Sequence, residues 1–385
     1  MSGRSTIAVV TGTRAEFGLL RSTMRAIGAE QSLELRVVVA GSHFLSPAET
    51  WREVEAEFEI AARVEMQRGG EPRDRLGDAM ALGRGISGFA DAFSEIGADC
   101  VLVLGDRIEA FGAASAASVM GIPVAHVHGG DCAEGVADEA MRHAITKLAH
   151  IHLPATKQSG ERIVRMGESP ERVHVVGSPA IDGLSAIPAM KDAEFASLGC
   201  PQIVFCMHPI GRDDDAERRD AGLVLEALRD RRVLALMPNH DAGREGIVRA
   251  IHEAGRSGNL RVAEHLSRDR FVALCKRVAC EGGVIVGNSS AGLIECSALA
   301  PALPCVNVGA RQAGRERPSS VVDPEGNDRA SITRALGLAQ EIDRGRVDHP
   351  YGDGRAGERI ASILRDSGFG DAATRAALVR KHNAY

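Results

Sequence analysis

The sequence predicts an α/β protein made of two Rossmann-like domains, and three observations support this prediction. Short segments rich in β-branched residues alternate with longer segments of helical periodicity along almost the whole chain, an order that indicates parallel sheets covered by helices on both faces. The alternation stops near residues 182–201 and then starts again. The chain of 385 residues is too long for one compact core and suits two domains of ordinary size.

The first half begins with a predicted strand at 7–11 and a helix at 17–30. Further strands are expected at 36–40, 100–104, 123–127 and 173–176, with helices at 76–97, at 107–120 and from about residue 137. Residues 50–75 are polar and irregular, which predicts a helix and a loop. Residues 188–199 are polar without clear periodicity. We therefore expect a first domain at 1–183.

The second half repeats the same architecture. Strands are expected at 202–207, 233–237, 260–264, 284–286 and 304–308, with a helix at 214–230. This pattern predicts a second domain at 184–368. The last segment, 369–385, has a helical pattern and is expected to pack back on the first domain.

Composition excludes several classes of protein. Hydrophobic residues make up 44% and charged residues 25%, as in soluble globular proteins. The net charge of −6 disfavours nucleic acid as a partner. No apolar run approaches the ~20 residues of a membrane span, and the N-terminus enters a strand without a signal-peptide pattern, so a cytoplasmic protein is expected. The eight cysteines form no C-x-x-C pair, which predicts reduced thiols and no metal site.

Polar and glycine-rich clusters follow the carboxyl ends of nearly all predicted strands. In open parallel sheets ligands bind at these ends, so we expect the site in a cleft between the two domains. The richest cluster follows the strand at 123–127. His128 and Asp131 lie in its exit turn, and the next helix places Glu139, Arg142 and His143 opposite its apolar face. A solvated helix face with ion pairs is the simpler interpretation, but it leaves the histidines and glycines at the strand exit unexplained.

Other strand exits carry groups suited to a phosphorylated ligand. Arg14 lies between a strand and a helix, where an anion can bind the helix N-terminus. Ser289 and Ser290 lie in a small-residue turn that can hold a diphosphate, and Glu295 suits a sugar hydroxyl better than a phosphate. Arg311 lies in a basic loop that can neutralise a leaving diphosphate. Two further strand ends carry Asp106 with Arg107, and His208.

Several strings together resemble one enzyme family across nearly the whole chain. They are TGTRAEFGLL, GSHFLSP, LGDRIEAF, HVHGGDCAEGVADEAMRHAITKLAHIH, GSPAIDGL, MHP, PNHDAGREG, GNSSAGLIE, GARQAGRERP and YGDG. The chain resembles the hydrolysing UDP-N-acetylglucosamine 2-epimerases, whose relatives act on diacetylbacillosamine nucleotides. The resemblance implies a glycosyltransferase-B-like fold, a UDP-sugar substrate with UDP as product, no redox cofactor and no required metal. It also implies a homodimer or homotetramer, with UDP bound by the second domain and most catalytic residues in the first.

The family's chemistry is elimination of UDP with loss of the C2 proton of the sugar, followed by addition of water that inverts C2. By resemblance, catalytic positions are Asp106, Asp131, Glu139 and His208, with Arg142 and His143 orienting them. The matched substrate-binding positions are Arg14, Ser42, His43, Arg107, His143, Asn239, Ser289, Ser290, Glu295 and Arg311. Asp131 stands where relatives commonly carry Glu, and His128 where some carry Glu, so His128 is expected to participate. The resemblance does not assign the base and the acid.

Three alternatives stay open at this point: a non-hydrolysing epimerase, a glycosyltransferase of the same fold, and an inactive UDP-sugar sensor. The HGGD and DEAMRHAITK strings favour the hydrolysing branch. The sugar is also open, because N-acetylglucosamine and its diacetylated 6-deoxy analogue differ only at C4 and C6.

Overall fold

A computed structural model of the chain describes residues 4–46, 49–68, 71, 75–132, 138–239, 241–256, 258–264, 266–382 and 384. The chain forms two compact units. Unit 1 contains Met1–Asp131, Asp138–Asp182 and Gly352–Tyr385, and unit 2 contains Cys132–Ala137 and Gly183–Tyr351. Within the described part, no helix is both long and apolar enough to span a membrane.

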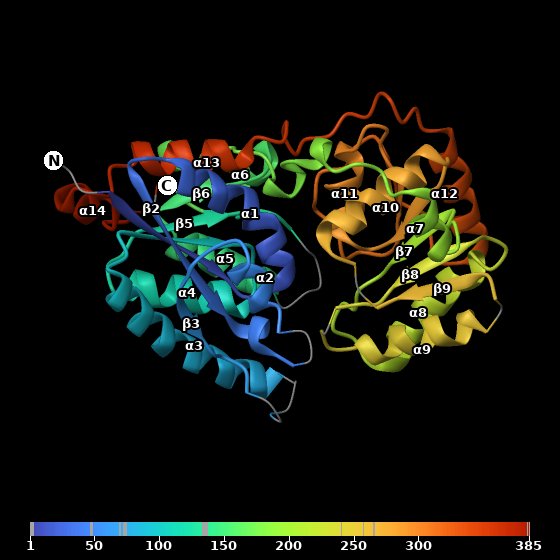
Figure 1. Ribbon diagram of the computed structural model, residues 1–385, viewed down its shortest axis with the longest axis horizontal. Helices are drawn as coiled ribbons and strands as arrows, with labels where there is room; N and C mark the ends of the chain where they lie inside the picture. Colours follow the sequence, from blue (N-terminus) through green and yellow to red (C-terminus); the bar gives the residue numbers. More distant parts are fainter. Residues whose placement is uncertain are drawn as a thin grey trace. The chain divides into compact units, whose positions relative to one another are not determined.

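Unit 1 is built on a parallel six-stranded sheet with the order β3-β2-β1-β4-β5-β6 (Figure 1). Its strands are β1 (Ser5–Thr11), β2 (Leu33–Ala40), β3 (Ile60–Val64), β4 (Cys100–Leu104), β5 (Val124–Val127) and β6 (Ile151–Leu153). Its helices before the crossover are α1 (Arg14–Ala29), α2 (Trp51–Glu55), α3 (Arg75–Ile96), α4 (Ile108–Val119), α5 (Asp138–Leu148) and α6 (Lys157–Arg165). This strand order is that of the Rossmann fold, as predicted.

The two faces of this sheet bury alternate residues of each strand. Ile7 and Val9 pack into one core with α1, whereas Ala8 and Val10 pack into a second core with α3 and α4. Successive side chains of a strand point to opposite faces, so a strand covered on both sides is apolar throughout. The near-continuous hydrophobic segments in the sequence therefore correspond to strands of a sheet that is covered by helices on both faces.

Unit 2 repeats this architecture with a second parallel six-stranded sheet, β12-β11-β10-β7-β8-β9 (Figure 1). Renumbered from its own first strand, this is the same Rossmann order. The strands are β7 (Ile203–Cys206), β8 (Val233–Leu236), β9 (Leu260–Ala263), β10 (Val284–Gly287), β11 (Cys305–Asn307) and β12 (Val321–Val322). The helices are α7 (Asp192–Ser197), α8 (Asp214–Ala227), α9 (Arg244–Gly255), α10 (Arg268–Cys280), α11 (Ser290–Leu293) and α12 (Arg329–Glu341).

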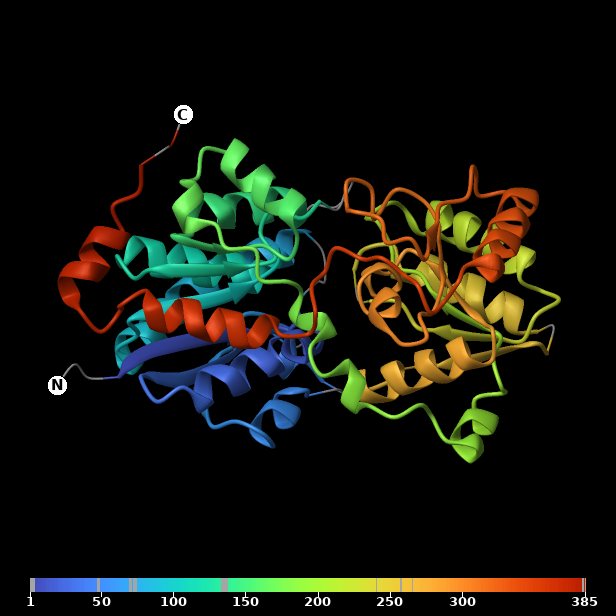
Figure 2. The ribbon, with the colours of Figure 1, turned by 90° about the horizontal axis from the view of Figure 1, so that it is seen from above.

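The chain leaves unit 1 after Asp182 and returns to it at Gly352. The returning segment forms α13 (Ala356–Asp366), which lies beside α1 (Figure 2) and adds Ile360 and Leu364 to its core. Asp182 binds the start of α13, because its two carboxylate oxygens accept the N–H groups of Ala356 (3.0 Å) and Gly357 (2.7 Å). Residues 352–368, which we expected in the second domain, thus belong to unit 1.

The C-terminal segment also belongs to unit 1. Beyond α14 (Ala372–Leu378), the ammonium of Lys381 donates to the carbonyl oxygens of Thr146, Lys147 and Ala149 at 2.7–3.0 Å. It also pairs with the buried carboxylate of Glu168 at 2.7 Å. A cation at these carbonyls caps the C-terminus of α5, where the helix has unpaired acceptors and partial negative charge.

The sequence missed three strands and misplaced one. β3, β6 and β12 are short, and β3 lies in the segment expected to be irregular. The strand predicted at 173–176 is wrong, since this segment makes only an isolated bridge between Val173 and His152. Helix α1 begins at Arg14, three residues before the predicted start, because Thr13 caps it by accepting the N–H of Glu16.

Candidate functional site

The predicted functional residues follow strands on either side of the point where strand order reverses. This point lies between β1 and β4 in unit 1 and between β7 and β10 in unit 2. Ligands of open α/β sheets bind beside such a switch point, beyond the carboxyl ends of the strands.

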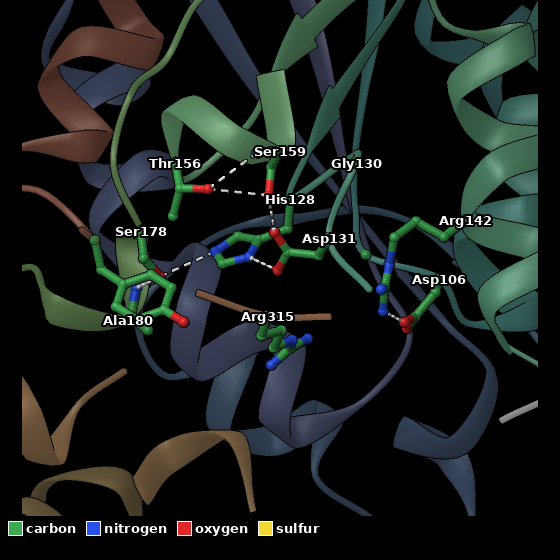
Figure 3. Close-up of polar contacts among 12 residues, drawn as sticks. Asp106, His128, Gly130, Asp131, Arg142, Thr156, Ser159, Ser178, Ala180 and Arg315 are labelled. Carbon is green, nitrogen blue, oxygen red and sulfur yellow. Dashed lines mark hydrogen bonds and ion pairs between the residues drawn. The ribbon is translucent and has the colours of Figure 1, made fainter. Parts of the chain in front are cut away.

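The exit of β5 carries a buried chain of hydrogen bonds centred on His128 (Figure 3). The ring Nδ1 is 3.0 Å from Oδ2 of Asp131, and Nε2 is 2.9 Å from Oγ of Ser178. The other carboxylate oxygen of Asp131 accepts the hydroxyl of Ser159 at 2.9 Å. His128 has a left-handed backbone with φ 62°, which is uncommon for a residue other than glycine and recurs at functional sites.

A second charged pair joins the exit of β4 to α5. The guanidinium of Arg142 forms an ion pair with the carboxylate of Asp106 (Figure 3), and only 3% of the Arg142 side chain is exposed. His126 holds the same turn from β5, since its Nε2 donates to the carbonyl oxygen of Gly105 at 2.7 Å. Burial lowers the pKa of His126 to about 3, so this ring is neutral and acts as a structural donor.

Glu139 and His143 form a further pair on α5. His143 Nε2 lies 3.5 Å from Oε1 of Glu139, with both side chains partly exposed. Helix α5 thus carries three predicted site residues, and each of them lies next to another predicted site residue of opposite type: Arg142 pairs with Asp106, and His143 lies beside Glu139. The side chain of Asp138 lies outside the described residues.

The exits of β1 and β2 place three predicted ligand-binding residues differently. Arg14 pairs with Glu53 at 2.9 Å while remaining partly exposed. Ser42 donates to the carbonyl oxygen of Gly12 at 2.9 Å and so links the two strand exits. His43 is fully buried between the hydroxyls of Thr11 (3.0 Å) and Thr50 (2.8 Å). Burial lowers the pKa of His43 to about 4, which is the environment of a structural histidine.

Two buried glutamates support these turns. Glu16 accepts the N–H of Gly12 at 2.7 Å, and Glu109 packs so closely that a Cβ at Gly12 or Gly41 would lie 2.4 Å from it. Burial, and then the charge of Glu109, raises the pKa of Glu16 to about 7. The partly exposed Arg107 lies 3.4 Å from the Glu109 carboxylate. The turns after β1 and β2 therefore require glycine at positions 12 and 41, and the side chains of Glu16 and Glu109 pack against these turns.

In unit 2, Asn288 holds His208. Its Oδ1 accepts the N–H of His208 at 2.7 Å, and its Nδ2 donates to the carbonyl oxygen of His208 at 2.8 Å. The N–H of Asn239 donates to Nδ1 of His208 at 3.2 Å, so the hydrogen of the neutral ring is on Nε2. Burial and the nearby guanidinium of Arg311 lower the pKa of His208 to about 3.

The remaining predicted residues of unit 2 gather around the same turn. Arg311 and Gln312 both donate to the carbonyl oxygen of Asn288, at 3.2 and 2.8 Å. Ser289 caps α11 by accepting the N–H of Ala291 at 3.4 Å, and Ser290 begins that helix. Glu295 follows one turn later. The exits of β7, β8, β10 and β11 thus converge on one polar cluster.

The sequence did not single out five residues that hold these sites. Ser159 and Ser178 bind Asp131 and His128, Asn288 and Gln312 hold the unit 2 turn, and Glu109 supports the glycine turns. All of these except Ser159 lie within the strings that carry the family resemblance, but nothing local in the sequence distinguishes them from their neighbours. Among the described residues, no group of three or more His, Cys, Asp or Glu side chains is arranged to hold a metal ion.

Two parallel sheets of Rossmann order, each with polar clusters at its switch point, define a two-unit α/β protein of the glycosyltransferase-B-like class. A sequence-family model described as UDP-N-acetylglucosamine 2-epimerase matches residues 25–365. The chain therefore belongs to the UDP-N-acetylglucosamine 2-epimerase family, as the sequence motifs predicted.

Three relatives illustrate the range of activities in this family. The chain is 32% identical to a hydrolysing UDP-N,N'-diacetylbacillosamine 2-epimerase of Legionella pneumophila, over 93% of this chain and 95% of that protein. It is 30% identical to a hydrolysing GDP/UDP-N,N'-diacetylbacillosamine 2-epimerase of Campylobacter jejuni, over 84% and 85%. It is 29% identical to a UDP-N-acetylglucosamine 2-epimerase of Neisseria meningitidis, over 94% and 95%.

Solved structures support the fold. The UDP-GlcNAc 2-epimerase of Neisseria meningitidis bound to UDP-GlcNAc superposes with a TM-score of 0.77 at 18% identity, covering 94% of this chain and all of that one. The MnaA–UDP structure from S. aureus gives 0.76 at 18% identity, covering 94% and 96%.

Proposed function

We propose that the protein is a hydrolysing 2-epimerase of a UDP-2-acetamido sugar. The observation that carries the proposal is the buried His128–Asp131 pair beside the Arg142–Asp106 pair, which supplies acid and base groups at adjacent strand exits. Two relatives at 32% and 30% identity are named as hydrolysing enzymes. A general acid and a general base within one site are the groups that this reaction needs.

The proposed reaction balances in two steps. A base removes the proton from C2 while the C1–O bond to UDP breaks, which leaves a double bond between C1 and C2. Water then adds its hydroxyl to C1, and C2 takes a proton on the face opposite to the one from which the first proton was removed. His128 with Asp131, and Asp106 with Arg142, are the proposed proton-transfer groups, and Glu139 is a further candidate.

We assign the nucleotide to unit 2. Arg311 supplies a positive charge near His208, and the turn of Asn288, Ser289 and Ser290 supplies hydroxyl and N–H donors. Burial and the charge of Arg311 lower the pKa of His208 in the free protein, and a diphosphate bound here would oppose that shift, because negative charge stabilises the protonated ring. His208 is therefore the proposed proton donor to the diphosphate.

The sugar is proposed to be N-acetylglucosamine or its 4-acetamido-6-deoxy analogue. The named relatives include enzymes for both. A product assay in deuterated water, with each UDP-sugar offered separately, tests the proposal. We expect UDP and a free manno-configured sugar carrying deuterium at C2, and the faster substrate identifies the sugar.

Other products indicate the alternatives. A UDP-linked manno sugar would place the protein among non-hydrolysing epimerases, and turnover only with an added acceptor would indicate a transferase. UDP binding without turnover of either substrate would indicate a sensor. Asp131→Asn should abolish turnover, whereas Asp91→Asn, at an exposed position of α3, should leave it unchanged.

A further inference from the structure

We propose that Ser178 is a positioning residue that donates to Nε2 of His128 and so fixes the orientation of the ring, whose Nδ1–H tautomer is set by Asp131. The inference rests on the proposed function, in which His128 and Asp131 transfer protons. Ser178 comes from the segment that precedes the crossover to unit 2, 50 residues from His128 in sequence.

Counting donors and acceptors assigns the hydrogen in each hydrogen bond that joins Asp131, His128 and Ser178. The Asp131 carboxylate only accepts hydrogen bonds, so the Nδ1 atom of His128, 3.0 Å away, carries the hydrogen. In the neutral ring Nε2 is then an acceptor, and the Ser178 hydroxyl at 2.9 Å must donate to it. The Ser178 oxygen accepts the N–H of Ala180 at 3.2 Å, which occupies a lone pair and leaves its hydrogen for His128.

The hydrogen bonds on the other side of Asp131 also point toward its carboxylate. The Thr156 hydroxyl donates to Ser159 Oγ at 3.1 Å, and Ser159 donates to Asp131 at 2.9 Å. Hydrogen bonds from both ends therefore point toward the Asp131 carboxylate, and bonds aligned in this way polarise one another. All five side chains are at least nine-tenths buried, so water does not compete for these contacts.

Ser178 is suited to positioning because its backbone is itself fixed. Arg359 donates to the carbonyl oxygen of Val176 at 3.1 Å, and Asp182 binds the first two N–H groups of α13. The Ser178 side chain is fully buried. It therefore acts on the reaction through His128, by fixing the ring orientation at Nε2 while Asp131 fixes the tautomer at Nδ1.

Long-range ¹⁵N–¹H correlation spectra of ¹⁵N-histidine-labelled full-length protein test the assignment directly. The His128 signals are identified by their loss in His128→Gln. We expect the wild-type ring to show a protonated Nδ1 and an unprotonated Nε2. A wild-type ring protonated at Nε2 alone would overturn the proposal, and this measurement needs neither substrate nor a variant of Ser178.

Steady-state kinetics of Ser178→Ala provides the second test, with Ser94→Ala on the exposed side of α3 as the matched control. We expect kcat to fall about tenfold or more, with unchanged KM and UDP affinity, and the Nε2 signal of His128 to shift because that atom loses its hydrogen-bond donor. Ser178→Cys, which keeps a weak donor, should restore part of kcat. A Ser178→Ala protein with wild-type kcat and an unshifted Nε2 signal would also overturn the proposal.

The two proposals fail in different ways. An inactive wild-type protein with the expected tautomer refutes the proposed function but keeps the assigned hydrogen bond from Ser178 to His128. Normal epimerase activity with the other tautomer refutes the positioning role alone. If Ser178→Ala does not fold, Ser178→Cys and the wild-type spectrum still decide.

Discussion

The side-chain amide of Asn288 binds both backbone polar groups of His208: its Oδ1 accepts the N–H at 2.7 Å, and its Nδ2 donates to the carbonyl oxygen at 2.8 Å. The two residues are 80 positions apart and follow neighbouring strands of the unit 2 sheet. The same Asn288 offers its own carbonyl oxygen to Arg311 and Gln312. Through its side chain and its backbone carbonyl group, Asn288 thus connects the proposed proton donor, His208, to Arg311, which is proposed to bind the diphosphate.

Asn288→Asp replaces the amide donor with an oxygen that faces the carbonyl oxygen of His208. We expect UDP affinity to fall about tenfold, because an unpaired buried polar group costs roughly 1–3 kcal/mol. Isothermal titration with UDP measures the change. Asn259→Asp, at an exposed position of the same unit, should bind UDP as the wild type does. Equal affinities for both variants would contradict a holding role for Asn288.

Breaking the ion pair of Arg142 and Asp106 should destabilise the protein whichever partner is changed, because a charge is left without its partner. Arg142→Met leaves Asp106 without its buried cation, for which we expect a loss of ~3 kcal/mol in the free energy of unfolding. Asp106→Asn together with Arg142→Met should recover part of that loss. Urea unfolding of the two single variants and the double variant measures the coupling. Arg334→Met breaks an exposed pair with Glu325 and should cost less than ~0.5 kcal/mol.

Two glycines should respond to alanine with opposite signs. Gly287 ends β10 with φ 143°, and a Cβ there would lie 2.0 Å from the backbone oxygen of Cys206. Gly287→Ala should therefore destabilise unit 2 and weaken UDP binding. Gly337 lies inside α12, where an added Cβ would meet no atom of the described residues outside its own helix backbone within 4 Å. Gly337→Ala should therefore stabilise the protein by about 0.5–1 kcal/mol. Thermal unfolding distinguishes the two, and a stabilising Gly287→Ala would contradict the contact.

Acid should destabilise the protein through its buried histidines. The pKa of His126 is about 3 in the folded protein, whereas the unfolded chain binds the proton near its ordinary value of about 6.5. Stability from this group is therefore complete above pH 6.5 and falls as the pH drops toward 3, by roughly 2 kcal/mol between pH 7 and pH 5. Glu16, with its pKa raised to about 7, has the opposite sign and loses stability as the pH rises from 4.5 to 7.

Urea unfolding of His126→Gln at pH 7 and pH 5 isolates the histidine contribution. We expect the variant to lose about 2 kcal/mol less than the wild type over this interval, whatever its absolute stability. His252→Gln provides the control, because His252 is exposed on α9 and should leave the pH dependence unchanged. An identical pH dependence in His126→Gln and the wild type would show that His126 is not held neutral.

The sequence alone determined the fold class, the two Rossmann-like units and the strand exits at which the predicted site residues lie. These features follow from hydrophobic periodicity and glycine turns, which are local properties of the chain. It missed β6, three residues long, and placed a strand at 173–176. Such short segments gain their structure from pairing with neighbours, so their own residues carry little signal.

Tertiary structure alone decided which polar residues meet. His128 and Asp131 were predicted from one strand exit, but the partner that binds the other nitrogen of His128 comes from 50 residues away. His43 was predicted to bind substrate and His128 to participate in catalysis, and the fold buries His43 between two threonines but places His128 against a carboxylate. Hydrogen-bond partners and burial depend on contacts between distant segments, and these contacts, not residue type, determine whether a histidine is structural or able to transfer a proton.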